Sequence, residues 1–340
     1  MNICITGGGT GGHLMIAEAL LEAASKAGHQ CIFIGSTKGQ DRKYFADSKV
    51  FTKVYFLETT GVVNQKGLGK LKALFKVLAA FFKARKLLKE NKVDLVYSVG
   101  GFSAAPASIA SLSKKIPLFI HEQNAVEGRL NAILKPYAKS FISAYDEDSK
   151  IKGYPVKEIY SQTKRERKSL ETIVFLGGSH GAKAINDLAL SVASILSKRQ
   201  IKIIHQAGEA DFDRVQKEYE TLGVKVELYA FTTELPALIS KADFAISRAG
   251  ASTLWELTTN GVPAFYVPYP YAAGDHQYFN AKFIVDNEMG WCEREGDNLS
   301  CSLEVALTNL YLSTKSEKLL HYAKKDVATT MIEELEKSLV

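Results

Sequence analysis

The chain has 340 residues, of which 46% are hydrophobic and 24% charged, with a formal net charge of +6, and this length allows about two ordinary globular domains. Its four cysteines are scattered without C-x-x-C spacing, which argues against a zinc site or a disulfide framework and favours a reducing, cytoplasmic compartment. We expect no secretion, because the N-terminus shows no basic stretch followed by a short apolar one, and no membrane-spanning helix, because no apolar stretch approaches roughly 18 residues.

Apolar runs typical of buried parallel strands alternate with helical patterns along almost the whole chain. The expected strands are 2–6, 30–34, 51–56, 94–99, 117–121, 140–143, 172–176, 202–206, 225–229, 243–247 and 263–267. This alternation predicts an α/β fold with two Rossmann-like, doubly wound domains that face each other across a cleft. The expected parts are a first domain over 1–157, a polar linker over 158–168, a second domain over 169–315, and a closing helix within 316–340 that could pack back on the first domain.

A glycine-rich segment, Thr6-Gly-Gly-Gly-Thr-Gly-Gly-His13, follows the first expected strand and leads into a helical pattern. Glycines permit close backbone approach to a ligand, and the helix N-terminus behind them favours negative charge. The spacing Gly7-x-Gly9-x-x-Gly12 fits the dinucleotide fingerprint, but the second expected strand ends in Gly35-Ser36 and not in an acidic residue that would hold a ribose. A nicotinamide or flavin cofactor is therefore disfavoured.

His13 is the titratable side chain of this loop. Unperturbed imidazole titrates at about pH 6.5, so it can take a proton from a hydroxyl group near neutral pH. The structural alternative is a histidine that only hydrogen-bonds the backbone at the start of a helix.

Residues 61–92 hold nine Lys/Arg residues and a single acidic one, Glu90, so the positive charge forms a local patch. Apolar side chains recur there at three- and four-residue spacing, with lysines between them. This pattern suits a helix that lies in an anionic membrane interface, and it also suits a crossover helix that buries its aromatic residues. The residues expected to contact the membrane are Leu71, Lys72, Phe75, Lys76, Leu78 and Phe82. No DNA- or RNA-binding motif accompanies them, so we expect no nucleic-acid partner.

Two more strand ends carry candidate binding segments in the first half. Ser98–Pro106 is a second glycine-containing turn, and His121-Glu-Gln-Asn124 places four polar residues directly after an apolar strand. A helix N-cap requires only one polar side chain. We therefore expect residues 121–124 to form a ligand-binding loop.

The second half contains three comparable segments. Gly177-Gly-Ser-His-Gly181 combines backbone N–H groups, the Ser179 hydroxyl and a helix N-terminus, which suits a diphosphate bound without metal, although a plain structural turn would look the same. In Ser247–Glu256, small residues open a helix and Glu256 can accept both hydroxyls of a ribose or merely complement the helix dipole. In Asp275–Asn280, Gln277 offers amide groups to sugar hydroxyls, and Asp275 could simply cap a helix.

Taken in chain order, these segments resemble the family of GT-B N-acetylglucosaminyltransferases that act at the cytoplasmic face of the membrane in bacterial peptidoglycan synthesis. The resemblance rests on Gly7–His13, Gly100-Gly101 with Pro106, His121–Asn124, Gly177–Ala182, Ser247–Glu256 and Asp275–Ala281. It implies an inverting transfer of N-acetylglucosamine from UDP to the 4-hydroxyl of the muramoyl sugar of lipid I, which gives lipid II. The implied partners are UDP-N-acetylglucosamine, lipid I and an anionic membrane surface, with no cofactor and no metal.

The resemblance also assigns roles to individual residues. His13 is the expected catalytic residue, which deprotonates or orients the acceptor hydroxyl. Thr232 falls where the family recognises uracil through backbone groups. The expected UDP-N-acetylglucosamine contacts are Thr10, Gly11, Gly12, Asn124, Ser179, Thr232, Ala251, Ser252, Thr253, Leu254, Trp255, Glu256 and Gln277.

The sequence departs from the family pattern at one position with a chemical consequence. Tyr154-Pro-Val-Lys157 stands where the family has Asn-Pro-Val-Arg, so a bidentate arginine contact to the donor becomes at most a lysine point charge. Two other functions also stay open from the sequence. A GT-B transferase with a different lipid or small-molecule acceptor would keep the donor loops, and a non-catalytic nucleotide-sugar or membrane-surface binding module would not need His13.

Overall fold

The structure is a computed structural model that describes residues 1–59, 68–178 and 181–339, with backbone only for 68–74 and 339. The chain forms two compact units. Unit 1 comprises Met1–Lys157 and Asp326–Val340, and unit 2 comprises Glu158–Lys325.

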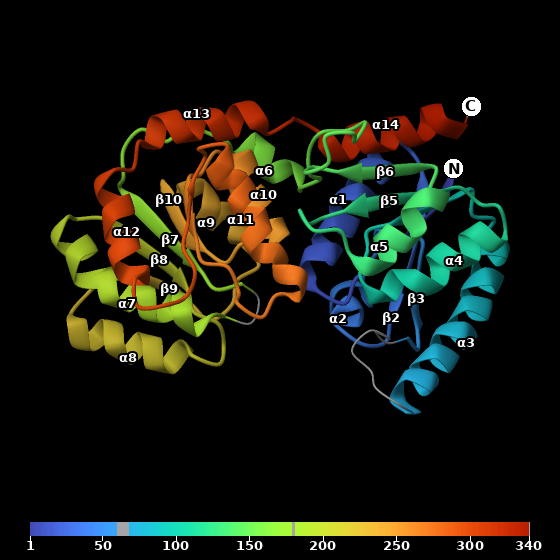
Figure 1. Cartoon of the computed structure of the whole chain (residues 1–340), viewed down its shortest axis with the longest axis horizontal. Helices are drawn as coiled ribbons and strands as arrows, with labels where there is room; N and C mark the ends of the chain where they lie inside the picture. The colour runs from blue at the N-terminus through green and yellow to red at the C-terminus, as the bar shows by residue number, and fades with distance from the viewer. Residues whose placement is uncertain (60–67, 179–180, 340) are drawn as a thin grey trace. The chain divides into compact units, whose positions relative to one another are not determined.

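Unit 1 is built on a six-stranded parallel sheet with the order β3-β2-β1-β4-β5-β6 (Figure 1). Its strands are β1 (Asn2–Thr6), β2 (Gln30–Ser36), β3 (Lys53–Leu57), β4 (Leu95–Ser98), β5 (Leu118–Glu122) and β6 (Ser140–Ser143). Its helices are α1 (Gly11–Lys26), α2 (Asp41–Phe45), α3 (Leu68–Glu90), α4 (Ala105–Ser113), α5 (Arg129–Leu134) and α14 (Val327–Leu339), with 3-10 turns η1 (Phe102–Ala104) and η2 (Lys135–Tyr137). Apolar residues of α3, α4 and α5 share one core cluster with the sheet, and α14 packs beside α1.

Unit 2 repeats this architecture with the order β12-β11-β10-β7-β8-β9. Its strands are β7 (Thr172–Leu176), β8 (Lys202–Gln206), β9 (Glu227–Tyr229), β10 (Phe244–Ser247), β11 (Ala264–Tyr266) and β12 (Trp291–Cys292). Its helices are α6 (Glu158–Gln162), α7 (Lys183–Lys198), α8 (Phe212–Leu222), α9 (Leu235–Lys241), α10 (Ala251–Asn260), α11 (His276–Asp286), α12 (Leu299–Thr308) and α13 (Leu312–Tyr322), with the 3-10 turn η3 (Ala273–Asp275). Helices α7, α8 and α12 bury their apolar residues in one cluster against the sheet.

The apolar runs predicted these strands well. All eleven expected strands are confirmed, with ends that shift by no more than two residues, because strands of a parallel sheet are buried on both faces and therefore nearly continuously apolar. Strand β12 was not expected, since a two-residue strand has no periodicity to detect.

The boundaries of the two units differ from the expected ones at two places. Residues 158–168, expected as a linker, lie in unit 2 and begin with α6. Residues 316–340 contain parts of two helices. Helix α13 ends at Tyr322 in unit 2, and α14, which begins at Val327, belongs to unit 1.

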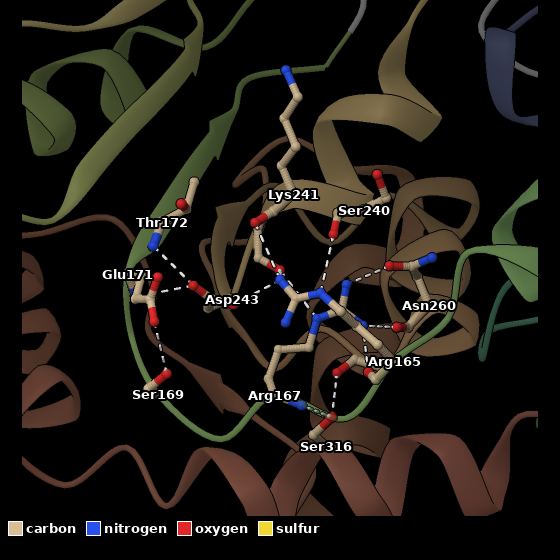
Figure 2. A network of polar contacts seen from close by, with 12 residues as sticks. Arg165, Arg167, Ser169, Glu171, Thr172, Ser240, Lys241, Asp243, Asn260 and Ser316 are labelled. Carbon is tan, nitrogen blue, oxygen red and sulfur yellow. Dashed lines mark hydrogen bonds and ion pairs between the residues drawn. The ribbon is translucent and has the colours of Figure 1, made fainter.

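A buried arginine explains why residues 158–168 belong to unit 2. Figure 2 shows Arg167 reaching from this segment into the domain, where its side chain is 0% exposed. Its guanidinium donates to the Ala242 carbonyl at 3.1 Å and to both the backbone and the side-chain oxygen of Asn260. Arg165 lies beside it and pairs with Asp243 at 2.7 Å. The polar run is therefore folded against the domain along part of its length.

Candidate functional site

In both sheets, successive strands are first added on one side of the first strand and then on its other side. The place where the side changes is the topological switch point. In unit 1 the chain proceeds from β1 outward to β3 and then returns to β4 on the other side of β1. In unit 2, β7 and β10 are related in the same way. Open α/β sheets bind ligands beside the carboxyl ends of the strands at such a switch point. The candidate sites are therefore the β1/β4 edge of unit 1 and the β7/β10 edge of unit 2.

The glycine loop after β1 packs directly on the loop after β4. The Gly8 N–H donates to the Gly100 carbonyl at 3.1 Å, and a Cβ on Gly101 would lie 2.1 Å from the Gly8 oxygen. Gly8 has φ +151 and Gly9 φ +88, so both lie in the region that favours glycine. Gly11 and Gly12, two expected ligand contacts, form the first turn of α1, where backbone N–H groups have no helical partner.

A buried acid that sequence analysis missed holds this loop in place. The Asp41 carboxylate accepts the Gly9 N–H at 2.5 Å and the Ser36 N–H at 2.8 Å. A Cβ on Gly8 would lie 2.5 Å from Asp41 Oδ1. An acidic residue thus does lie near the end of β2, but it binds backbone groups of the loop itself. The signal that could have found it is an acid a few residues beyond the strand end, at the start of the next helix.

His13 lies between two side chains at the β1/β4 edge. Its Nδ1 is 2.8 Å from Thr10 Oγ1, and its Nε2 is 2.9 Å from the Gln123 amide nitrogen. Thr10 precedes α1, and its hydroxyl serves His13 and does not cap the helix. His13 is half-buried. The structure therefore brings the first glycine loop and residues 121–124, which are far apart in sequence, to one place.

In residues 121–124, the first two side chains anchor the segment and the next two lie at the sheet edge. Burial lowers the pKa of His121 to about 3, with a smaller contribution from the charge of His13, so His121 is neutral at physiological pH. The Glu122 carboxylate accepts the Asn124 N–H at 3.0 Å, the Gly128 N–H at 2.8 Å and Asn131 Nδ2 at 2.8 Å. Glu122 thus fixes the loop, and Gln123 and the half-buried Asn124 are held at the sheet edge.

The glycine loop of unit 2 is shaped by close backbone packing before α7. A Cβ on Gly177 would lie 2.6 Å from the Ala182 nitrogen. Gly181 has φ +75, and a Cβ there would lie 2.4 Å from the Ala207 oxygen. The N-terminus of a 16-residue helix, α7, follows this turn, and a helix N-terminus favours an anion. Ser179, an expected contact, lies outside the described residues.

Helix α10 starts at the same edge, beyond Gly250. Ser252 Oγ donates to Glu256 Oε1 at 2.9 Å, and Glu256 is only 4% exposed. Ser252 and Thr253 are half-buried near the start of the helix, and Ala251 is buried. The hydrogen bond holds the carboxylate toward the first turn of the helix, where a ligand hydroxyl could reach it.

The side chains of Leu254 and Trp255, two further expected contacts, are buried. Leu254 is 0% exposed and Trp255 is 2% exposed. The Trp255 ring lies 5.9 Å from that of Phe283 and 6.3 Å from that of Tyr322, between centroids. Both side chains lie on the face of α10 that packs against the interior of unit 2.

Gln277 lies in the first turn of α11, and Thr232 lies in the loop between β9 and α9. Gln277 Oε1 accepts the Tyr269 N–H at 3.0 Å, which orients the side chain with its amide nitrogen as the remaining donor. Thr232 Oγ1 accepts the Glu234 N–H at 2.9 Å within the turn before α9. The structure places Asp275 in an ion pair with Arg294 at 2.5 Å. Lys157, the replacement noted above, pairs with Glu18 within unit 1 at 2.9 Å.

Helix α3 has one buried and one exposed face among its described side chains. Ala80, Ala84 and Leu88 are buried against the sheet. On the outside, Phe75 is 71% exposed, Leu78 49% and Phe82 58%. Lys76 is half-buried and lies 3.4 Å from Glu58. The side chains of Leu71 and Lys72 lie outside the description.

No three His, Cys, Asp or Glu side chains within the described ranges gather closely enough to hold a metal ion. Of the helices that the structure describes, none is long and apolar enough to cross a membrane.

Known proteins match this chain over nearly its whole length. The model of the glycosyltransferase family 28 N-terminal domain matches residues 3–143, and that of the C-terminal domain matches residues 172–337. The UDP-N-acetylglucosamine--N-acetylmuramyl-(pentapeptide) pyrophosphoryl-undecaprenol N-acetylglucosamine transferase of Sulfurimonas denitrificans is 62% identical over 339 residues, which cover 100% of this chain and 99% of the relative. The transferase of the same name from Sulfurovum sp. is 52% identical over 96% of each chain.

Among solved structures, the crystal structure of Acinetobacter baumannii MurG superposes with a TM-score of 0.79 and 29% identity, over 99% of each chain. Matches of this extent over both units show that the chain belongs to glycosyltransferase family 28 and has the two-domain GT-B fold.

Proposed function

We propose that this chain transfers N-acetylglucosamine from UDP-N-acetylglucosamine to the 4-hydroxyl of the muramoyl sugar in lipid I and so forms lipid II. The names of the relatives describe this transfer, and the similarity to them extends over the whole chain. The structural observation that carries the proposal is His13, which lies at the switch point of unit 1 with a hydrogen-bond partner at each ring nitrogen. A hydroxyl acceptor requires a base, whereas a binding module does not.

In the proposed reaction a single displacement inverts the configuration at C1 of the donor sugar. The acceptor oxygen bonds to C1 of N-acetylglucosamine as His13 takes the hydroxyl proton, and the bond from C1 to the phosphate oxygen breaks. UDP leaves with that electron pair. The N-terminus of α7 would stabilise the negative charge that develops on the diphosphate.

Most of the donor contacts are proposed for unit 2. The Glu256 carboxylate, held by Ser252, would accept the ribose hydroxyls. The Gln277 amide nitrogen would donate to a sugar hydroxyl, and backbone groups near Thr232 would bind uracil. The remaining proposed contacts are Thr10, Gly11, Gly12, Asn124, Ser179, Ala251 and Thr253, with Leu254 and Trp255 contributing through their backbone only.

A direct assay tests this function. Purified protein, UDP-N-acetylglucosamine carrying a radiolabelled sugar and a lipid I analogue are expected to give labelled lipid II analogue together with UDP. Donor hydrolysis without labelled lipid would contradict the proposed acceptor. A polyprenyl diphosphate sugar that lacks the muramoyl group serves as the control acceptor, and its efficient glycosylation would favour a transferase with a different acceptor.

We also propose that the chain binds peripherally to the inner face of the bacterial plasma membrane, through α3. Three apolar side chains, Phe75, Leu78 and Phe82, are exposed on one side of this helix, within a strongly basic segment. An apolar face with lysines around it suits the boundary between acyl chains and anionic headgroups. Membrane binding would bring the enzyme to its lipid-linked acceptor.

The charge of this surface is expected to set the strength of binding. Reversing Lys76 and Lys83 to Glu should weaken binding to vesicles that contain phosphatidylglycerol by at least about 30-fold, since each nearby lysine contributes about 1 kcal/mol. Co-sedimentation measures the change, and turnover of a soluble acceptor analogue should stay unaltered. The double variant Lys198→Glu and Lys202→Glu, in unit 2, is the matched control. Equal binding by both double variants would remove the proposal.

A further inference from the structure

The hydrogen bonds of His13 assign its protonation state. An amide nitrogen can only donate a hydrogen bond, so His13 Nε2, 2.9 Å from Gln123 Nε2, accepts. The same amide nitrogen lies farther from Nδ1, at 3.4 Å. A neutral imidazole with an accepting Nε2 carries its proton on Nδ1, which then donates to Thr10 Oγ1 at 2.8 Å. The nitrogen that would accept a substrate proton, His13 Nε2, is therefore the one that already accepts a hydrogen bond from Gln123.

Gln123 is held at this position by its neighbours. It directly follows Glu122, whose carboxylate accepts two hydrogen bonds from backbone N–H groups of the loop that begins at Asn124 and one from the Asn131 side chain of α5. Gln123 is 8% exposed, so its side chain is packed inside unit 1 beside His13. Its other amide atom, Oε1, is buried and has no hydrogen-bond partner among the described residues. A buried amide oxygen without a partner costs free energy unless another state of the site uses it.

We propose that Gln123 is the positioning residue of His13, with its amide nitrogen bound to the neutral imidazole and its amide oxygen available to the protonated one. This inference rests on the proposed role of His13 as the base. The acceptor hydroxyl replaces the amide N–H at Nε2, its O–H bond breaks as the N–H bond of the imidazolium forms, and the oxygen attacks the sugar carbon. A half-turn of the Gln123 amide then presents Oε1 to the new Nε2–H.

Among the described residues, the charged or titratable groups of the elements that pack around His13 include His121, Glu122 and Asp41. From β5, His121 stays neutral, because burial lowers its pKa to about 3, and Glu122 accepts three hydrogen bonds. From α2, the Asp41 carboxylate accepts the N–H of Gly9 in the glycine loop and the N–H of Ser36 at the end of β2. The loop after β4 faces His13 with Gly100, which brings no side chain. A change in the titration of His13 on substitution of Gln123 therefore reports on the contact between these two residues.

Two variants of Gln123 separate positioning from mere packing. Gln123→Met keeps the length of the side chain but removes both amide groups, and kcat should fall by roughly 10-fold, with an unchanged KM for UDP-N-acetylglucosamine. Gln123→Glu is isosteric and places a carboxylate at Nε2, which favours the imidazolium. The pH at which His13 loses its proton should then rise by about one unit. Since only neutral His13 can act as a base, the acidic limb of the kcat profile should move to higher pH by the same amount.

The tautomer of His13 provides a readout that needs no turnover. In protein with ¹⁵N-labelled histidine, the ring signals of His13, assigned by their loss in His13→Gln, should have the Nδ1–H pattern. In Gln123→Met the two tautomers should mix, and in Gln123→Glu the imidazolium should persist to higher pH. An exposed glutamine, Gln216→Met, is the matched control and should leave these signals and kcat unchanged.

The outcomes distinguish this inference from the proposed function. An Nε2–H pattern in the unchanged protein, or an acidic limb that does not move in Gln123→Glu, overturns the positioning role even if the enzyme is active. Absence of lipid product from the unchanged protein overturns the proposed function, whatever the tautomer of His13 is.

Discussion

Replacing His13 by alanine is expected to lower kcat for the transfer to a lipid I analogue by about 10²–10⁴-fold. The imidazole lies at the switch point of unit 1, where its Nε2 can take the proton of an incoming hydroxyl. The KM for UDP-N-acetylglucosamine should change little, because the donor contacts are proposed mainly in unit 2. A coupled assay of UDP release over a range of donor concentrations, at a saturating concentration of the lipid I analogue, measures both quantities.

The pH dependence provides a second check on the same variant. The acidic limb of the kcat profile should disappear in His13→Ala, because the group that must be deprotonated is gone. The control is His321→Ala, which removes an exposed histidine of unit 2. Undiminished UDP release from His13→Ala, with lipid I present, would show that another group is the base.

The sequence predicted the sheets and the loops at the switch points, because these depend on local patterns. Buried strands are continuous apolar runs, and a turn that requires positive φ, as at Gly8 and Gly181, selects glycine. Gly7–His13 and residues 121–124 could both be identified as candidate site segments on this basis. Their roles in UDP-N-acetylglucosamine and acceptor binding stay predictions.

The pairing of distant residues was beyond the sequence. Gln123 meets His13 only because β5 follows β4 in the sheet, so that two strand ends separated by 110 residues share an edge. Asp41 binds the glycine loop from the helix after β2, and no spacing rule in the fingerprint predicts an acid with that task. In α10, the polar start and the buried Trp255 lie on different faces, which a linear motif does not distinguish.

The polar composition of residues 158–168 predicted a linker, and Arg167 shows why that prediction does not describe their packing. Residues 158–168 are rich in charge, a pattern that usually indicates a solvated linker, yet this guanidinium is completely buried. Burial lowers the pKa of Arg167 to about 9, which still leaves it protonated at neutral pH. The charge is tolerated because its donors meet carbonyl oxygens of α9, of α10 and of its own segment.

Arg167→Met is accordingly expected to destabilise unit 2 by about 3–5 kcal/mol. Methionine fills much of the volume, but the oxygens of Asn260 and Ala242 would lose their donor while remaining buried. The experiment can be confined to unit 2, because the only two tryptophans of the chain, Trp255 and Trp291, both belong to it. Urea denaturation followed by tryptophan fluorescence should therefore show an earlier transition for this unit.

Two further variants make the test specific. Arg167→Lys keeps a positive charge but not the planar fork of donors, so its loss of stability should be intermediate. Arg199→Met removes an exposed arginine of the same unit and should change the free energy of unfolding by less than about 0.5 kcal/mol. If Arg167→Met and Arg199→Met unfold at the same urea concentration, the network in Figure 2 does not hold residues 158–168 to unit 2. If only Arg167→Met unfolds at a lower urea concentration, the buried Arg167 guanidinium is what holds residues 158–168 to unit 2.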